Sequence, residues 1–308
     1  MPQKTVNQLS EHLQFPEPVV TPLYSPVAVR SGVEISMLRL DEIHPVISGN
    51  KIYKLFYFLK DALASHHKTI ITFGGAYSNH LAATAYTGNQ LGIKTIGIVR
   101  GEAPAALSPT LLFCLEQKMQ LEFISRADYK NNHDILNNLA RKHGAHILIP
   151  EGGYSPEGAL GASMIGSYFN DQNYTHICVA AGTATTFAGI INGAGTQQEV
   201  IGFSVLKGMD DIEKRLHELG VNKSKHYLYN GEYHFGGYAK KNEELIRFIN
   251  HFYKENSIPL DFVYTGKMMF GVYNLVEKGN FSKGSKILCI HTGGLQGNQS
   301  LPAGTLIF

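Results

Sequence analysis

The stretch TIITFGGAYSNH, residues 69–80, carries much of the information about the fold. It begins as a run of apolar and β-branched residues typical of a buried strand, passes through Gly74-Gly75, and reaches Ser78 and Asn79, residue types that start helices. Such a junction places hydroxyl and amide side chains beside backbone N–H groups that have no partner within the helix. The sequence therefore predicts a polar pocket at residues 74–79.

Similar apolar runs alternate with amphipathic segments on both sides of this junction. We expect strands at 27–29, 33–38, 69–73, 95–99, 121–124, 146–149, 177–181, 200–205 and 287–291, and helices at 79–91, 109–118, 129–143, 186–191, 211–219, 243–253 and 268–277. Apolar strands separated by helices are typical of parallel β-α-β units. We therefore expect an α/β protein of two lobes, each a twisted, mostly parallel sheet flanked by helices. The site should lie in the cleft between the lobes, at the carboxyl ends of strands.

The composition argues against several classes of function. The 27 basic and 25 acidic residues leave a net charge of +2, which gives no reason to expect nucleic acid or a membrane as a partner. No run approaches the ~20 apolar residues of a membrane span, and residues 1–15 lack the order of a signal peptide. The three cysteines lie in apolar runs without metal-ligand spacing. We expect free thiols, no metal site and a cytoplasmic protein.

The segment SGNK, residues 48–51, offers a lysine behind a glycine turn. Most lysines, roughly 90%, are solvated surface charges. Lys51, however, precedes a helix pattern and has Lys54 three residues on, close to the same helical face. A buried amine beside another cation loses its proton more readily. Lys51 is therefore a candidate either for a phosphate contact or for an amine that bonds covalently to a carbonyl compound.

The segment GTATT, residues 182–186, follows the expected strand 177–181 and opens a helix. Small residues there let backbone N–H groups converge on an anion, and the threonines add hydroxyl donors. An ordinary strand-to-helix turn explains the same pattern, and a helix N-cap explains Ser78 and Asn79 equally well. Each segment alone is weak evidence for function.

Together, SGNK (48–51) and GGAYSNH (74–80) resemble the pyridoxal-phosphate enzymes of the tryptophan synthase β family, fold type II, in the branch of 1-aminocyclopropane-1-carboxylate deaminase and D-cysteine desulfhydrase. The resemblance implies that Lys51 carries pyridoxal 5'-phosphate, that Lys54 contacts its phosphate, and that Asn79 faces the ring hydroxyl. Ser78 would lie over the cofactor near the substrate, as a candidate acid/base group or contact to the substrate carboxylate. The residues that match the phosphate-binding loop of the family are Gly182, Thr183, Ala184, Thr185 and Thr186, with Ala184 where glycine is more usual.

The last third of the chain matches the family at further places. Tyr238 in FGGY and Tyr264 in VYTGK correspond to two active-site tyrosines, although any one of 16 tyrosines is more often structural. Thr265 and Thr292 stand where ring-opening deaminases carry a glutamate and a leucine. A carboxylate facing the ring nitrogen favours a protonated ring, whereas a hydroxyl tolerates the neutral ring. These threonines favour the desulfhydrase branch. We expect His80 to be structural.

The resemblance also implies an organisation and a reaction. A large cofactor-binding domain would comprise residues 1–53 and 156–308, a small α/β domain would be inserted at 54–155, and the chain would form a homodimer. The expected reaction on a small amino acid is an α,β-elimination, most simply of D-cysteine to pyruvate, sulfide and ammonia. The alternatives are deamination of 1-aminocyclopropane-1-carboxylate to 2-oxobutyrate, dehydration of serine or threonine, and a non-catalytic phosphate- or amino-acid-binding module.

Overall fold

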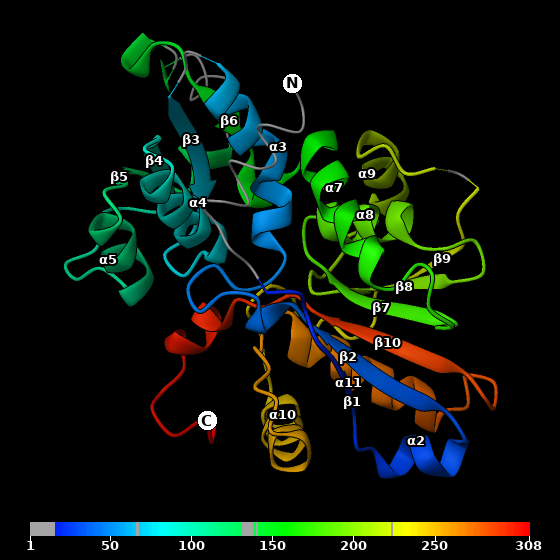
Figure 1. The fold of residues 1–308 in the computed structure, drawn as a ribbon. Coiled ribbons are helices and arrows are strands. Elements are labelled where there is room, and N and C mark those ends of the chain that lie inside the picture. Colours follow the sequence, from blue (N-terminus) through cyan, green and yellow to red (C-terminus); the bar gives the residue numbers. More distant parts are fainter. Residues whose placement is uncertain (1–15, 66–67, 131–137, 140, 223) are drawn as a thin grey trace.

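Two separate sheets organise the molecule (Figure 1). The computed structural model describes residues 16–308 except 66–67, 131–137, 140 and 223. The larger sheet has six strands in the order β1-β2-β10-β7-β8-β9, and the smaller has four in the order β5-β4-β3-β6. Among the paired strands of this part of the chain, β1 runs antiparallel to β2, while the other pairs are parallel. The two-lobed α/β architecture expected from the sequence is confirmed.

The elements follow one another in strand–helix alternation. The strands are β1 (Val20–Pro22), β2 (Glu34–Arg39), β3 (Thr69–Gly74), β4 (Lys94–Arg100), β5 (Gln120–Ile124), β6 (Ile147–Ile149), β7 (His176–Ala181), β8 (Glu199–Ser204), β9 (Tyr227–Asn230) and β10 (Lys286–His291). The helices are α2 (Pro26–Ser31), α3 (Lys51–Ala64), α4 (Asn79–Gln90), α5 (Pro109–Glu116), α7 (Pro156–Ser163), α8 (Thr185–Gly193), α9 (Ile212–Glu218), α10 (Glu243–Asn256) and α11 (Thr265–Glu277). Short 3-10 turns are η1 (Leu40–Glu42), η2 (Asp128–Lys130), η3 (Glu151–Gly153), η4 (Met164–Tyr168) and η5 (Leu295–Ser300). The helix expected at 129–143 falls largely outside the described residues.

The prediction of a strand at 27–29 was wrong, because these residues belong to helix α2. Ser25 caps the helix by accepting a hydrogen bond from the N–H of Ala28 at 3.3 Å, and Pro26 occupies the first helical turn. Gly32, with φ of 66°, ends the helix in the left-handed conformation. A serine cap, an early proline and a terminal glycine are helix signals, and here they outweigh the strand preference of the valines.

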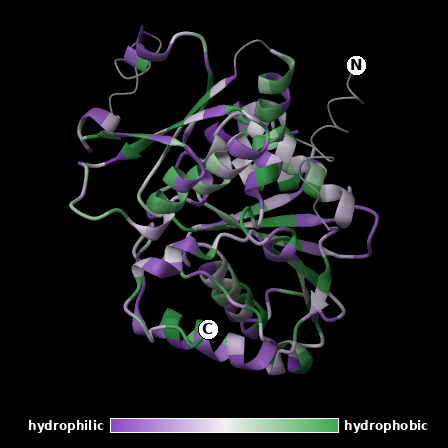
Figure 2. Cartoon of the chain, turned by 60° about the vertical axis from the view of Figure 1, so that its left-hand side comes forward, coloured by the Kyte–Doolittle hydropathy of each residue, from purple (hydrophilic) through white to green (hydrophobic). Residues whose placement is uncertain are grey.

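The larger sheet is covered by helices on both faces. Along β7, Ile177 and Val179 pack into the hydrophobic cluster that contains residues of α7, α8 and α9. Cys178 and Ala180, which point the other way, pack against residues of α10 and α11. Alternation of this kind buries both faces of a parallel sheet, which explains why its strands are apolar throughout. Figure 2 shows hydrophobic residues gathered on the inner strands and helices, with hydrophilic residues toward the periphery.

The smaller sheet is formed by strands that lie within residues 69–149, between β2 and β7 of the larger sheet. Helices α3 and α4 pack near it and contribute Leu55, Leu59 and Ala83 to a shared hydrophobic cluster. The limits of the inserted domain, 54–155, stay a prediction. The cysteines Cys114, Cys178 and Cys289 are buried free thiols, as expected. Within the described residues, no helix is both long and apolar enough to cross a membrane.

Candidate active site

The expected site residues lie where strands of both sheets end. From the smaller sheet, β3 ends at Gly74, directly before Ser78 and Asn79, and from the larger sheet β7 ends directly before the 182–186 loop. The turn 292–294 follows β10. Because parallel strands present their carboxyl ends at one edge, these segments come together where the two sheets meet, as the contacts below show.

Lys51 is positioned by close packing of two glycine turns. Gly49 has φ of 85°, and a Cβ built on it would lie 1.8 Å from the carbonyl oxygen of Thr292. The N–H of Asn50 donates to that same oxygen at 3.0 Å. In the opposite direction, the N–H of Gly294 donates to Ser48 Oγ at 3.1 Å. Only glycine permits such an approach of backbone to backbone, so the SGNK turn is fixed against the 292–294 turn, and Lys51 begins helix α3 at a defined point.

The amine of Lys51 is linked to the 182–186 loop through Asn50. Lys51 Nζ donates to Asn50 Oδ1 at 2.6 Å, and Asn50 Nδ2 donates to Thr186 Oγ1 at 2.6 Å. Burial lowers the pKa of Lys51 to about 8, and the negative charge of Asp261 limits the fall. A lysine with this pKa has a useful fraction of free amine near neutral pH, as covalent attachment to an aldehyde requires.

Lys54 is buried beside the same loop. A Cβ built on Gly152 would lie 4.0 Å from Lys54 Nζ and 3.2 Å from Thr183 Cγ2, so the ammonium group and the loop meet at Gly152. Burial and the charge of Lys51 hold the pKa of Lys54 well below its usual range. Two neighbouring lysine amines in a region of low polarity favour the binding of an anion, which would offset both charges.

His80 lies on the other side of Lys54. A Cβ built on Gly153 would lie 3.3 Å from Lys54 Cε and 3.8 Å from His80 Cε1. Thr72 Oγ1 donates to the carbonyl oxygen of Ile149 at 2.9 Å, so at its 2.9 Å contact with His80 Nε2 it must accept. The proton of the neutral imidazole is therefore on Nε2, and Nδ1 is a buried acceptor without a partner in the described part of the chain. Burial, followed by the charges of Lys54 and Lys51, holds the pKa of His80 well below its usual range.

The 182–186 loop has the geometry of an anion site. Ala184, at the N-cap of α8, has φ of 69°, and no side chain caps the helix at this position. Thr183 Oγ1 and Thr185 Oγ1 lie 3.0 Å apart. A left-handed residue before a helix turns successive N–H groups toward one point, and the positive end of the helix dipole adds to the attraction. With Lys54 alongside, these residues fit the phosphate of pyridoxal 5'-phosphate.

Ser78 and Asn79 begin helix α4. Ser78 Oγ accepts from the N–H of Leu81 at 3.2 Å, so it is a helix N-cap whatever else it does. Asn79 Nδ2 donates to the carbonyl oxygen of Gly294 at 2.8 Å, which links α4 to the turn after β10. Asn79 Oδ1 is buried and has no partner among the described residues. An orphaned polar atom here is consistent with a polar group of a bound molecule, and the second N–H of the amide remains for the expected ring hydroxyl.

The two tyrosines identified from the sequence are in contact. The hydroxyl oxygens of Tyr238 and Tyr264 lie 3.4 Å apart, and the rings meet edge to face with centroids 6.0 Å apart. A Cβ built on Gly182 would lie 3.1 Å from Tyr264 Cε1, so this ring lies over the start of the 182–186 loop. Burial raises the pKa of both phenols, well above the usual range for Tyr264. Both side chains are therefore proton donors at neutral pH.

Asp261 is a site residue that the sequence reasoning missed. Its carboxylate is fully buried and accepts from the N–H groups of Val263, Tyr264 and Thr265 at 2.6–2.9 Å. It also accepts from Thr265 Oγ1 at 2.6 Å. The hydrogen of the Thr265 hydroxyl is thus directed to Asp261, while Thr292 lies buried at the glycine turn below Asn50. An aspartate a few residues before a helix start is a capping signal that could have been identified from the sequence.

Lys267 is a second residue that was missed. Its side chain is buried, and Nζ donates to the carbonyl oxygens of His234 at 2.8 Å and Gly237 at 2.7 Å. Gly236 and Gly237 have φ of 93° and 118°, and the N–H of Gly237 donates to the same His234 oxygen at 3.0 Å, so the turn before Tyr238 is held at both carbonyl groups. Lys267 therefore supports the segment that carries Tyr238.

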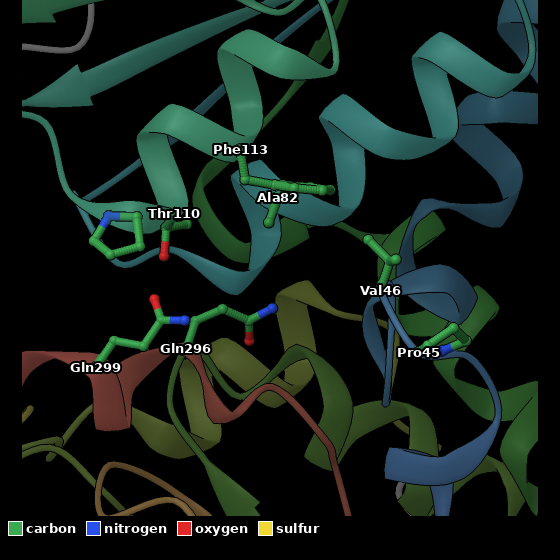
Figure 3. Close-up of a pocket in the computed structure, with 8 residues that line it drawn as sticks. Pro45, Val46, Ala82, Thr110, Phe113, Gln296 and Gln299 are labelled. Atoms are coloured by element: carbon green, nitrogen blue, oxygen red, sulfur yellow. The ribbon is translucent and has the colours of Figure 1, made fainter.

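A cavity of about 280 Å³ adjoins the site between α4, α5 and η5 (Figure 3). Ala82, one turn along α4 from Asn79, forms part of its wall, and Thr110 points across it toward Gln296 and Gln299. None of its lining residues is charged. The residues that line this cavity include none of Lys51, Lys54, Tyr238 and Tyr264. We therefore assign the chemistry to the contacts around Lys51 rather than to the cavity.

Comparisons with known proteins identify the family of the chain. The family model described as "Pyridoxal-phosphate dependent enzyme" matches residues 16–293. A Pyrococcus horikoshii protein named provisionally as a 1-aminocyclopropane-1-carboxylate deaminase is 33% identical over 283 residues, 86% of each chain. The mitochondrial bifunctional D-cysteine desulfhydrase/1-aminocyclopropane-1-carboxylate deaminase of Arabidopsis thaliana is 30% identical over 296 residues, 87% of this chain and 74% of that one.

Solved structures agree as well. The crystal structure of a 1-aminocyclopropane-1-carboxylate deaminase homologue matches with a TM-score of 0.76 and 28% identity, over 97% of each chain. Serine racemase from Dictyostelium discoideum matches with a TM-score of 0.69 at 13% identity, which shows likeness of fold alone.

Proposed function

The chain belongs to the family of pyridoxal-phosphate-dependent enzymes, and on that premise we propose that it catalyses α,β-elimination from a small amino acid, with D-cysteine as its reference substrate. The observation that carries the proposal is that a buried lysine amine and two contacting tyrosine hydroxyls meet at one loop, residues 182–186. Lys51 Nζ is linked to Thr186 through Asn50, and the ring of Tyr264, whose hydroxyl lies 3.4 Å from that of Tyr238, lies over Gly182. Burial lowers the pKa of the Lys51 amine to about 8, which favours its action as a base, and raises the pKa values of both tyrosines, which keeps them protonated.

The residues around Lys51 fit the cofactor. Lys51 would hold it covalently, while Lys54 and the 182–186 loop would hold its phosphate and Asn79 its ring oxygen. When bound, pyridoxal 5'-phosphate supplies an electron sink that stabilises negative charge at the α-carbon of the substrate. The protein supplies the orientation of the substrate and the transfer of protons.

We assign the proton transfers to three side chains. The free amine of Lys51 takes the proton from the α-carbon, and the electron pair of that C–H bond forms a double bond to the β-carbon. The bond between the β-carbon and sulfur breaks, and its electron pair leaves with the sulfur. Tyr238, whose hydroxyl accepts a hydrogen bond from that of Tyr264, donates a proton to the departing sulfur. Water then converts the released aminoacrylate to pyruvate and ammonia.

The choice of D-cysteine over a cyclopropane substrate is supported by Thr265 and Thr292. Neither supplies a carboxylate for the ring nitrogen, and the Thr265 hydroxyl already donates to Asp261. Elimination of a thiol places a smaller demand on the electron sink than opening a ring without an α-hydrogen. The second candidate is deamination of 1-aminocyclopropane-1-carboxylate, which the name of the Pyrococcus relative favours, whereas the Arabidopsis relative is named for both activities.

The test compares purified wild type with Lys51→Ala, using Lys60→Ala on the same helix as the control. Wild type and the control should show a visible absorbance band from the bound cofactor and release pyruvate and sulfide from D-cysteine. The Lys51 variant should lose both. Release of 2-oxobutyrate from 1-aminocyclopropane-1-carboxylate, with no sulfide from D-cysteine, would establish the second candidate instead. A wild type that stays colourless when supplied with pyridoxal phosphate would exclude both reactions.

A further inference from the structure

Arg100 and Glu151 form an ion pair that the reaction proposed above does not use. Arg100 ends β4, and Glu151 follows β6, the strands on either side of β3 (Figure 1). Neighbouring strands lie about 4.8 Å apart, so the two side chains reach toward each other across the turn that follows β3. Arg100 Nη1 and Glu151 Oε1 lie 3.8 Å apart. The turn below them is Gly74-Gly75, which leads into Ser78.

The pair is close both to the glycine turn that leads to Ser78 and to the residues assigned to the phosphate. A Cβ built on Gly75 would lie 3.7 Å from Arg100 Nη2, so the guanidinium group lies over the glycine turn. The residue after Glu151 is Gly152, which borders Lys54 and Thr183. Burial raises the pKa of Tyr238, and the charges of Glu151 and Arg100 then act on it in opposite directions. The pair is thus within electrostatic reach of the tyrosine that faces the leaving group.

The pair is loosely held and open to a ligand. A separation of 3.8 Å is too long for a hydrogen bond, so neither charge is satisfied by the other. The side chains of Arg100 and Glu151 keep 41% and 44% of their surface exposed. Exposed ion pairs of this kind contribute little to stability. Tyr129 stacks beneath the guanidinium group, with its ring centroid 5.5 Å from Arg100 Cζ, and so orients the cation.

We propose that Arg100 and Glu151 form an outer subsite that binds the leaving group of the substrate, and that this leaving group carries both a carboxylate and an ammonium group. The substrate class is therefore two amino acids joined through sulfur, as in lanthionine. Arg100 would bind the distal carboxylate in a charge-assisted pair, and Glu151 would bind the distal ammonium group. This inference rests on the proposed elimination.

The reaction with such a substrate balances. The α-proton of the proximal half passes to Lys51, the bond between its β-carbon and sulfur breaks, and the sulfur leaves with the electron pair and gains a proton. Lanthionine and one water thus give one cysteine, one pyruvate and one ammonia, with no oxidant or reductant. D-cysteine itself has no distal group, so it does not use the subsite.

The experiment compares four cysteine derivatives that differ in the charge of the sulfur substituent. These are S-propyl (neutral), S-(2-carboxyethyl) (negative), S-(2-aminoethyl) (positive) and lanthionine (both), all with the α-configuration that the enzyme accepts. Pyruvate release gives kcat and KM for wild type, Arg100→Gln and Glu151→Gln. Arg247→Gln is the matched control, because Arg247 forms an exposed pair with Glu243 at 3.4 Å on α10.

The two variants should respond differently, and mainly in KM. Arg100→Gln should lower kcat/KM about 3- to 10-fold for lanthionine and the carboxyethyl derivative, the range of a half-exposed ionic contact. Glu151→Gln should lower kcat/KM by a similar factor for lanthionine and the aminoethyl derivative. For the carboxyethyl derivative the same variant should raise kcat/KM about threefold, because the carboxylate of Glu151 no longer competes for Arg100. Arg100→Lys should restore part of the loss. The Arg247→Gln control should leave every reaction unchanged, and the reaction of D-cysteine, which has no distal group, should change less than that of lanthionine in both variants.

The outcomes separate this inference from the proposed function. If wild type releases pyruvate from D-cysteine but the variants change all four derivatives equally, or none, the elimination stands and the subsite is overturned. If no compound yields pyruvate, the elimination fails and the subsite fails with it. The absorbance spectrum of bound cofactor verifies that each variant is folded.

Discussion

At the floor of the site, Gly49 and Gly293 pack backbone against backbone, whereas at its rim Arg100 and Glu151 face each other across 3.8 Å with much of each side chain exposed. A change at the floor displaces main chain, because nothing flexible lies between the two turns. A change at the rim displaces only solvent and a weak ion pair. It follows that the glycine contact restricts changes near Lys51, where we propose that the cofactor binds. Substitutions of Arg100 or Glu151, where we propose that the leaving group binds, should change the stability of the protein little.

The largest effect should come from removing the amine at the floor. Lys51→Ala deletes the group that we propose holds the cofactor and takes the α-proton, so we expect kcat/KM for D-cysteine to fall by at least about 10³-fold. Pyruvate release and the absorbance spectrum measure this loss. Activity within tenfold of wild type would show that another residue acts as the base.

The glycine contact itself should be the next most sensitive feature. In Gly49→Ala the new methyl group would meet the Thr292 carbonyl, and the residue would keep an unfavourable φ, so we expect a loss of about 3 kcal/mol or more in the free energy of unfolding. Gly92→Ala is the control, since φ there is 66° but nothing lies within 4 Å of the new methyl. It should lose about 1 kcal/mol. Urea unfolding measures both free energies of unfolding. Equal losses in Gly49→Ala and Gly92→Ala would show that the positive φ alone, and not the contact with Thr292, determines the cost.

Lys54→Met should act in two opposite directions. Replacing this buried amine by an apolar side chain should raise the free energy of unfolding of the cofactor-free protein by about 1 kcal/mol, because burial strongly disfavours the charged form of Lys54. The same change should weaken the binding of pyridoxal phosphate about 10- to 100-fold. Fluorescence titration and thermal unfolding measure the two effects, with Lys60→Met on α3 as the control. A fall in both quantities would contradict this account of Lys54.

The smallest effect concerns pH. The pKa of Lys51 is lowered to about 8, so its free-amine fraction rises with pH and levels off above that value. The rate at which the cofactor-free protein takes up pyridoxal phosphate should therefore rise about fivefold from pH 7 to 8 and less than twofold from pH 8 to 9. An amine with an ordinary lysine pKa, such as that of Nα-acetyl-lysine, would continue to gain about tenfold per pH unit. Stopped-flow absorbance distinguishes the two curves.

The sequence predicted the parts of the site that are local along the chain. Strand β3, its glycine turn and the start of α4 at Ser78 lie within one short stretch, and Lys51 begins the helix that its pattern indicated. These features depend on residues a few positions apart, where strand preference and capping decide the outcome.

The parts that could not be predicted depend on contacts made only by the fold. Lys267 donates to carbonyl groups of residues that lie 30 and 33 positions away in the sequence. Arg100 approaches Glu151 because the sheet places β4 and β6 on the two sides of β3. The sequence pattern does not predict contacts between residues this far apart in the chain. The misassigned helix α2 is a different kind of error, since its cap, proline and terminal glycine were all present in the sequence.

The contact between the two glycine turns also imposes an order on biosynthesis. Ser48 and Gly294 are hydrogen-bonded across 246 residues, so a growing chain cannot fix Lys51 in place before β10 has left the ribosome. We predict that ribosome-bound chains stalled after residue 285 will not acquire the visible band of bound pyridoxal phosphate, whereas chains with residues 1–308 fully emerged will; a coloured complex at the earlier stage would refute this order. Capture of the cofactor would then report that β10 and the turn after it have been synthesised, rather than that the smaller lobe alone has folded.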